Sequence, residues 1–237
     1  MGNVASRIYK PSDFSAGQMH EMLVTLGKRG FSPEMATEVA NGQSGKAEKI
    51  VSLFPPTLVP ADYWKKFYQD FCGMEVDFSN AMVPDVQGDF VRILGIPQGL
   101  NLNGMYRACK EHFPCWTYTD DLDKVTAGLN EREPTKSYFI RVRDRVEADE
   151  EFQNTSANAI KGNGIKTETL LERMVHEAIF FHETGNHLDM RKITLCSGSR
   201  GSGGSVPGVG WFDDEMRVVW YDPQDADGPL RARAVVS

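Results

Sequence analysis

The sequence predicts an α+β protein in which a small helical region precedes a larger domain of mixed helices and strands. Three observations lead to this prediction. Helical apolar stripes occupy residues 13–54, a proline-rich stretch follows at 54–60, and beyond it helical patterns alternate with short strand patterns. We therefore expect a helical N-terminal region at 1–56 and a second domain at 61–237, whose most β-rich part is 196–237.

The N-terminal region carries a strong helix start at Ser32. Pro33 and Glu34 follow it, which is the usual order of an N-cap residue, a first-turn proline and a first-turn acid. The order of one helix, a Gly30-Phe31 turn and two further helices resembles the ubiquitin-associated type of three-helix bundle. That resemblance implies a protein-docking adaptor, and a helical bundle without a docking role is the alternative.

The second domain begins with an aromatic amphipathic helix and then alternates strands with helices. The apolar spacing predicts helices at 63–71 and 103–112, strands or extended segments at 89–94, 115–118, 137–143 and 192–196, a helix start capped by Asp120, and a loop at 148–163. A stronger signal follows this loop. Thr169 and Glu172 form a capping box, and Gly185 stands where a C-terminal glycine would end the helix, so we expect a helix over 169–184.

Charge and composition exclude several classes of protein. The net charge is -7, and an acidic chain is poorly suited to holding nucleic acid by its phosphates. No apolar run reaches the ~18 residues of a membrane span, and the N-terminus lacks a signal-peptide pattern. The 4 cysteines form no C-x-x-C pair, which favours reduced thiols. We therefore expect a cytoplasmic protein without a membrane span, and display on a surface stays open.

Three of the 5 histidines, His176, His182 and His187, lie in one short segment and raise the alternative of a metal-dependent hydrolase. A helical zinc site needs histidines at i and i+4, so that both imidazoles reach one ion. His176 and His182 instead point about 120° apart, at roughly 100° of rotation per helical residue. His112 and Cys115 are close in sequence but lack a third member of a triad. We expect no catalytic residue, no metal ligand and no cofactor.

The segment 206–221 predicts an antiparallel hairpin with two different faces. Alternation places large apolar residues on one face, which is typical of a core: Val209, Trp211, Met216, Val218 and Trp220. The other face mixes small, charged and aromatic residues, which suits a surface that contacts a ligand: Gly208, Gly210, Arg217, Val219 and Tyr221. A polar loop and an extended strand over 230–237 follow the hairpin.

The order of capped helix, Thr194-Leu195-Cys196-Ser197-Gly198-Ser199-Arg200 turn, Trp-bearing hairpin, polar loop and closing strand resembles a known family. It is similar to the variable proteins of diversity-generating retroelements, which have a C-type lectin fold of the formylglycine-generating-enzyme type. In that family a reverse transcriptase rewrites adenine-derived codons at the 3′ end of the gene. The family motif Gly-Gly-Ser-Trp is only partly present, as Gly203-Gly204-Ser205-Val206.

The resemblance implies a C-type lectin-like, ligand-binding domain that is not an enzyme. It assigns Trp211, Val218, Trp220, Leu230 and Arg233 to a constant framework. The residues that it places on a variable, ligand-binding face are Gly208, Gly210, Phe212, Asp213, Arg217, Val219, Tyr221, Asp222, Asp225, Ala226, Asp227 and Gly228. Gln224 lies among them, although changing the adenines of an asparagine codon does not yield glutamine. The expected partner is a protein of unknown identity, and the oligomeric state is open.

Overall fold

The computed structural model describes Ser32, Glu34, Met35, Thr37 and residues 60–237. The chain divides into two compact units, Met1–Thr57 and Leu58–Ser237. In the first unit, the hydroxyl of Ser32 accepts a hydrogen bond from the backbone N–H of Met35 at 3.3 Å, and the three described residues after Ser32 are helical. The predicted N-cap is therefore confirmed. The other predicted helices of this unit and the Gly30-Phe31 turn lie outside the described residues.

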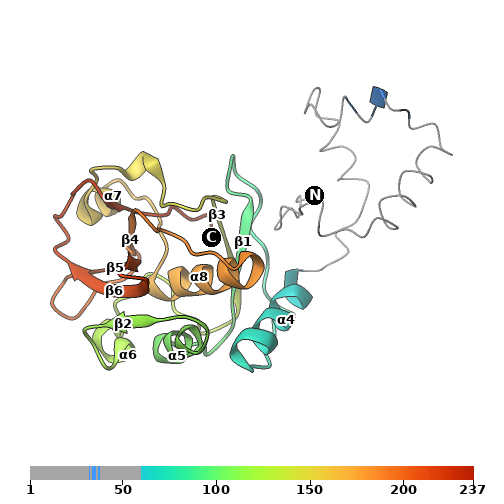
Figure 1. Ribbon diagram of the computed structural model, residues 1–237, viewed down its shortest axis with the longest axis horizontal. Helices are drawn as coiled ribbons and strands as arrows, with labels where there is room; N and C mark the ends of the chain where they lie inside the picture. Colours follow the sequence, from blue (N-terminus) through green and yellow to red (C-terminus); the bar gives the residue numbers. More distant parts are fainter. Residues whose placement is uncertain (1–31, 33, 36, 38–59) are drawn as a thin grey trace. The chain divides into compact units, whose positions relative to one another are not determined.

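The second unit is a mixture of helices and strands, so the α+β class is confirmed (Figure 1). Its elements are α4 Pro60–Cys72, β1 Arg92–Ile96, α5 Leu102–His112, β2 Cys115–Thr117, α6 Leu122–Thr126, β3 Tyr138–Val142, the 3₁₀ helix η3 Glu150–Phe152, α7 Ala157–Gly162, α8 Leu170–Thr184, β4 Ile193–Leu195, β5 Val206–Phe212, β6 Glu215–Tyr221 and β7 Leu230–Arg231. None of the helices found in the described part of the chain has the length and apolar character needed to cross a bilayer.

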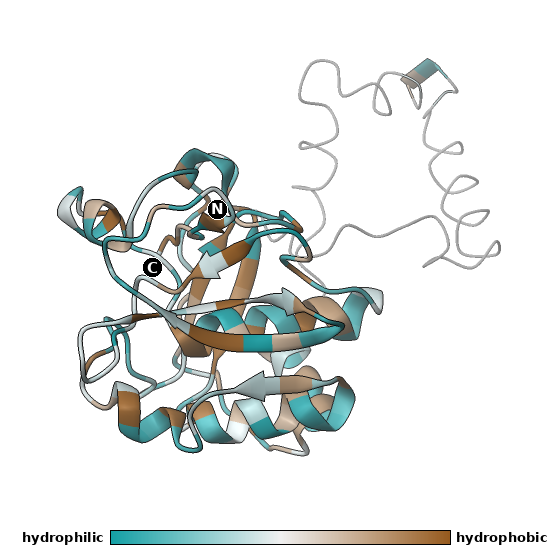
Figure 2. Ribbon diagram, turned by 60° about the vertical axis from the view of Figure 1, so that its left-hand side comes forward, coloured by the Kyte–Doolittle hydropathy of each residue, from teal (hydrophilic) through white to brown (hydrophobic). Residues whose placement is uncertain are grey.

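The strands form two sheets on either side of α8. β1 and β3 pair antiparallel, and a five-stranded sheet has the order β2-β6-β5-β4-β7. Helix α8 contacts both β1 and β5, and Figure 1 shows it between the two sheets. Figure 2 shows brown, hydrophobic stretches in strands of both sheets. Since α8 is covered from two sides, its first ten residues are all buried.

Local signals determine the ends of α8. The side chain of Thr169 accepts a hydrogen bond from the Glu172 N–H, the Glu172 carboxylate accepts from the Thr169 N–H, and Gly185 ends the helix with a φ of 66°. Both the predicted capping box and the glycine cap are confirmed, because each depends only on residues within a few positions of the helix end. The hydroxyl of Ser199 also accepts a hydrogen bond from the Leu170 N–H at 2.9 Å, which ties the loop after β4 to the same helix end.

Three expectations for the second unit are corrected. The predicted loop 148–163 contains η3 and α7, because Ser156 caps a helical turn and Ile160 buries its side chain in the core. The residue that caps α6 is Asp121 and not Asp120, since the Asp121 carboxylate accepts from the Lys124 N–H at 3.0 Å. The closing strand over 230–237 is also shorter than predicted. Only Leu230–Arg231 pair as a strand, and two isolated bridges, Thr167 with Ala234 and Arg141 with Val236, continue the pairing.

A buried ionic network joins α8 to the C-terminal segment. One oxygen of Asp189 accepts hydrogen bonds from the Arg173 guanidinium, at 2.8 and 3.1 Å, and from the Thr194 hydroxyl. The other oxygen accepts from Arg233 at 2.7 Å and from the backbone of Ala148. Burial raises the pKa of Asp189, but the charges of Arg233 and Arg173 outweigh it and hold that pKa below its usual value. Arg233, assigned to the framework by resemblance, is therefore an internal ion-pair partner.

Candidate ligand-binding surface

The hairpin β5–β6 turns at Asp213 and Asp214, whose φ angles of 51° and 62° are both positive. Two adjacent residues with positive φ are the mark of the tight hairpin turns that match strand twist, and aspartate tolerates this conformation. Arg217 reaches back to the turn, where its guanidinium donates to Asp213 at 2.8 Å and to Glu215 at 2.7 Å. The hydrogen bond to Glu215 is the main cause of a raised pKa for Arg217. The tip of the hairpin is thus held by its own side chains.

The predicted alternation is confirmed for most of the hairpin. Val209, Met216 and Val218 are fully buried on the side that faces α8. Cross-strand pairing of Val209 with Val218 and of Gly210 with Arg217 gives the register that this alternation requires. Four residues on the opposite side are half-buried: Phe212, Arg217, Val219 and Tyr221. Trp211 and Trp220, which were expected in the core, are only half-buried.

Two aromatic residues that the sequence reading missed extend this side of the hairpin. β2 pairs parallel with β6 and sets Trp116 opposite Arg217. The Trp116 and Tyr118 rings pack edge to face, with their ring centres 4.1 Å apart, and Tyr118 is 74% exposed. The Arg217 guanidinium carbon lies 5.6 Å from the centre of the Trp116 ring and 5.8 Å from that of Phe212. We call the set Trp116, Tyr118, Phe212, Arg217, Val219 and Tyr221 the hairpin face.

Gly208 and Gly210 do not belong to an exposed display face, because both are buried. A Cβ atom at Gly208 would lie 2.5 Å from Cε2 of Tyr221, and one at Gly210 would lie 3.0 Å from the backbone oxygen of Lys192. Alternation placed these glycines on the correct side of the hairpin, but the Tyr221 ring lies across Gly208. The sequence predicted that both glycines lie on the exposed ligand-binding face, whereas the structure buries them.

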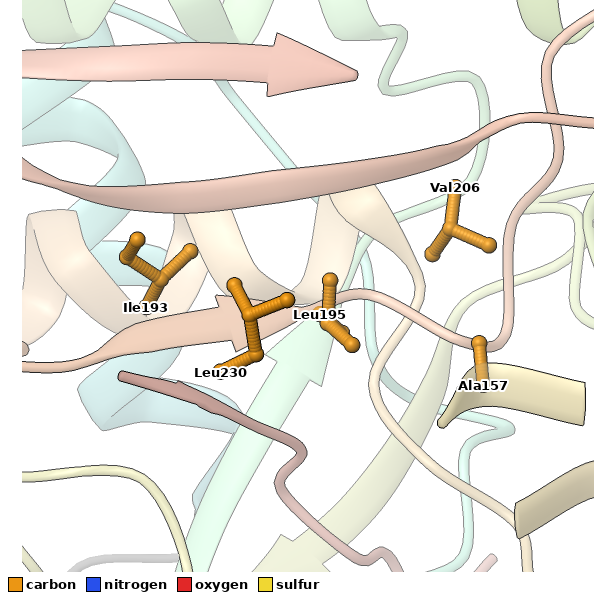
Figure 3. Packing of buried hydrophobic residues seen from close by; sticks show 5 residues of the cluster. All are labelled: Ala157, Ile193, Leu195, Val206 and Leu230. Carbon is orange, nitrogen blue, oxygen red and sulfur yellow. The ribbon is translucent and has the colours of Figure 1, made fainter. Parts of the chain in front are cut away.

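Tyr221 contacts the buried core as well as Gly208. Tyr221 and Phe212 both pack against a buried cluster, whose five residues are drawn in Figure 3: Ala157, Ile193, Leu195, Val206 and Leu230. Burial also raises the pKa of Tyr221. Because Phe212 and Tyr221 pack against this cluster, their half-buried side chains are held in position on the hairpin face.

The Gly208–Tyr221 contact predicts a coupling between these positions. Gly208→Ala is expected to lower the free energy of unfolding by about 1–3 kcal/mol, because the added methyl group overpacks the ring. In a Tyr221→Ala background most of that loss should disappear, because the ring is no longer present. A double-mutant cycle in urea measures the coupling. Equal losses from Gly208→Ala in both backgrounds would show that Tyr221 does not fill this space.

The polar loop 222–228, which follows β6, forms an acidic border at one end of the hairpin face. Asp222, Asp227 and Gly228 are exposed, whereas Asp225 and Ala226 are half-buried. The Asp225 carboxylate accepts a hydrogen bond from the Asp222 N–H at 3.0 Å, and the Asp222 carboxylate accepts from the Gln224 N–H at 2.8 Å. These predicted site residues lie at one end of β6 and Asp213 at the other, with the hairpin face between them.

The three histidines of the hydrolase alternative do not converge. His176 is fully buried, with Nδ1 2.8 Å from Glu168, whereas Nδ1 of His187 lies 2.9 Å from Glu177. His182 is exposed beside Phe67. Within the described ranges, no three His, Cys, Asp or Glu side chains are grouped so that they could hold a metal ion. The shared metal on which this alternative depends is therefore not supported by the positions of the imidazoles.

The His112 and Cys115 pair also lacks the geometry of a nucleophile and its base. The imidazole Nε2 of His112 is hydrogen-bonded to the backbone oxygen of Phe71 at 3.0 Å. Burial raises the pKa of the Cys115 thiol to about 12, so the thiolate is disfavoured at neutral pH. All four cysteines are free thiols, as predicted.

The Glu168–His176 pair predicts a pH dependence of stability. Burial raises the pKa of Glu168 to about 8, although Arg233 and Arg173 oppose the shift and Glu172 and Asp189 add to it. Burial also lowers the pKa of His176 well below 6.5, as do Arg233, Arg92 and Arg173, while Asp189 opposes the shift. Below pH 6.5 the two groups oppose each other: the lowered pKa of His176 makes stability rise with pH, whereas the raised pKa of Glu168 makes it fall. Between pH 6.5 and 8 only the folded state holds the Glu168 proton, so stability should fall as pH rises, by up to about 1.4 kcal/mol per pH unit.

Urea unfolding of the wild type and of Glu168→Gln at several values between pH 6 and 9 measures this dependence. The glutamine variant keeps the shape of the side chain but has no proton to lose. The difference in stability between the two proteins should therefore change across this window. A constant difference would show that Glu168 does not titrate near pH 8 in the folded protein.

Comparison with known proteins found no match: no protein-family model matches the chain, and neither a curated protein nor a solved structure matches it. The function is therefore inferred from the residues of the chain and their arrangement.

Proposed function

We propose that the protein is a non-enzymatic ligand-binding protein whose receptor surface is the hairpin face together with the loop 222–228. The observation that carries this proposal is the separation of the two sides of one hairpin. Val209, Met216 and Val218 are fully buried on one side, whereas aromatic and charged side chains are half-buried or exposed on the other. Aromatic residues and arginine are the types that dominate binding energy at protein interfaces.

The rigid support behind the hairpin face favours recognition. Phe212 and Tyr221 are anchored on the cluster behind them, and Arg217 is fixed by Asp213 and Glu215. Side chains that are already ordered lose little conformational entropy when a ligand binds, so more of the contact energy appears as affinity. Tyr118, the most exposed residue of the hairpin face, offers a large apolar contact area with a hydroxyl group.

The separation of the two sides also supports the idea that the domain is a C-type lectin-like variable protein of a diversity-generating retroelement. Phe212, Arg217, Val219 and Tyr221 lie within the same short stretch of sequence as the loop 222–228. Substitutions at these positions change the hairpin face and the loop, whereas Val209, Met216 and Val218 lie on the opposite, buried side of the hairpin. Gly208 and Gly210 are not part of the proposed variable set.

Selection from a displayed library of random peptides, with the full chain as bait, tests the binding role. The wild type should enrich peptides that Tyr118→Ala/Arg217→Ala no longer binds. The matched control is Met82→Ala/Arg145→Ala, because Met82 is 87% exposed and the side chain of Arg145 is 32% exposed, close to the 29% of Arg217. Enrichment that survives the hairpin-face changes, or no enrichment at all, would contradict the proposal.

A further inference from the structure

The surroundings of the hairpin face are strongly acidic. Between residues 208 and 228 the sequence has six acidic residues and one basic residue, Arg217; the acidic ones are Asp213, Asp214, Glu215, Asp222, Asp225 and Asp227. The carboxylates lie at both ends of β6, so they border the aromatic residues on two sides. A surface of this kind combines apolar contact area with negative potential.

Arg217 and its neighbours neutralise only part of this charge. Arg217 pairs with both Asp213 and Glu215, and the Asp213 side chain remains 84% exposed. The carboxylates of Asp222 and Asp225 accept hydrogen bonds from backbone amides of the loop. Lys192 immediately precedes β4 and Arg231 ends β7, and counting both bases still leaves six acids against three bases. Lys192 donates to the backbone oxygen of Gly228, and Arg231 to Ala148 and Gln153.

The hairpin face already holds one cation. The guanidinium of Arg217 lies within 6 Å of the ring centres of Trp116 and Phe212 while it is hydrogen-bonded to two carboxylates. Cations are attracted to aromatic faces at about this distance, and carboxylates bind guanidinium and ammonium groups with charge-assisted hydrogen bonds. The combination of rings and carboxylates on this surface therefore accommodates cationic side chains.

We infer that the ligand is a basic polypeptide segment, with arginine or lysine side chains next to an apolar or aromatic residue. This inference rests on the proposed receptor role of the hairpin face. The basic side chains pair with carboxylates at the two ends of β6, and the apolar residue contacts the exposed Tyr118 ring beside Trp116. Complementary charge speeds association and selects among partners, whereas a phosphate-rich ligand is repelled by this surface.

The peptide selection described above separates this inference from the proposed function. Peptides enriched on the wild type should be rich in arginine and lysine. A labelled member of the enriched set then serves as the probe, and its dissociation constant is measured by fluorescence anisotropy for two triple variants. Asp213→Asn/Asp222→Asn/Asp225→Asn removes three charges but keeps acceptor oxygens for the loop hydrogen bonds. The control, Asp62→Asn/Asp85→Asn/Glu150→Gln, removes three exposed carboxylates elsewhere.

The first triple variant should bind the probe at least about tenfold more weakly, a loss of ~1.4 kcal/mol, and the control should bind it about as the wild type does. Peptides that need the hairpin face but show no excess of basic residues would overturn the inference and leave the receptor role standing. An unchanged affinity in the first triple variant would also overturn it. The absence of any enrichment that depends on the hairpin face would overturn both.

Discussion

Asp189→Ala is expected to lower the free energy of unfolding by about 3–5 kcal/mol, which is a large part of the ~5–15 kcal/mol that stabilises a typical domain. The Asp189 carboxylate is fully buried and binds two guanidinium groups, those of Arg173 and Arg233. Arg173 keeps a second partner in Glu177, whereas Arg233 keeps only neutral acceptors, the Thr194 hydroxyl and backbone oxygens. The main cost is therefore an uncompensated charge on Arg233.

Denaturant unfolding of Asp189→Ala, of Asp189→Ala/Arg233→Met and of a control at the hairpin tip checks this explanation. Asp213→Asn, at an exposed carboxylate on the hairpin tip where asparagine tolerates the positive φ, should change stability by less than about 0.5 kcal/mol. Adding Arg233→Met to Asp189→Ala should restore part of the lost stability, because the unpaired charge is then absent. If the double variant is less stable than Asp189→Ala alone, the loss comes from something other than unpaired buried charge.

Gly198→Ala is expected to have the second largest effect, a loss of about 1–3 kcal/mol or more. A Cβ atom at this position would lie 2.8 Å from the backbone oxygen of Thr167 and 3.1 Å from that of Glu168. Backbone atoms at a helix start cannot move aside as a side chain can. The Gly198 N–H also donates to the Glu168 oxygen at 3.2 Å, so relieving the clash would weaken this bond. The substitution should therefore separate the loop after β4 from the N-terminus of α8.

Gly203→Ala provides a matched control in the same Gly/Ser loop. A Cβ atom at Gly203 has no neighbour within 4 Å, and its backbone does not need a positive φ. Thermal unfolding of both variants should show a clear drop in Tm for Gly198→Ala and little change for Gly203→Ala. Similar Tm values for the two would mean that the close approach of the loop to α8 does not stabilise the domain.

The parts of the fold that depend on neighbouring residues could be predicted from the sequence. The capping box of Thr169 and Glu172, the cap at Gly185 and the inward side of the hairpin are all determined within a few residues. The short helix α7 was missed because the polar composition of 148–163 outweighed a weak signal. Ser156 followed by Ala157 and Ile160 was the signal that could have indicated it.

The parts that depend on distant residues could not be predicted. Trp116 joins the hairpin face only because a three-residue strand pairs parallel with β6, about a hundred positions later in the chain. Alternation alone also cannot show that the ring of Tyr221 lies over Gly208. The ionic network around Asp189 likewise brings together three separate segments, and no short spacing pattern encodes it.

Sequencing the part of this gene that encodes residues 196–237, in many members of a population of the source organism, tests the central claim most directly. We expect differences to concentrate in the codons of Phe212, Arg217, Val219, Tyr221 and the loop 222–228, while those of Val209, Met216 and Val218 stay constant. A near-copy of this region, differing mainly at adenines, should lie beside a reverse transcriptase gene. Differences spread evenly over both sides of the hairpin, with no such copy nearby, would contradict the claim.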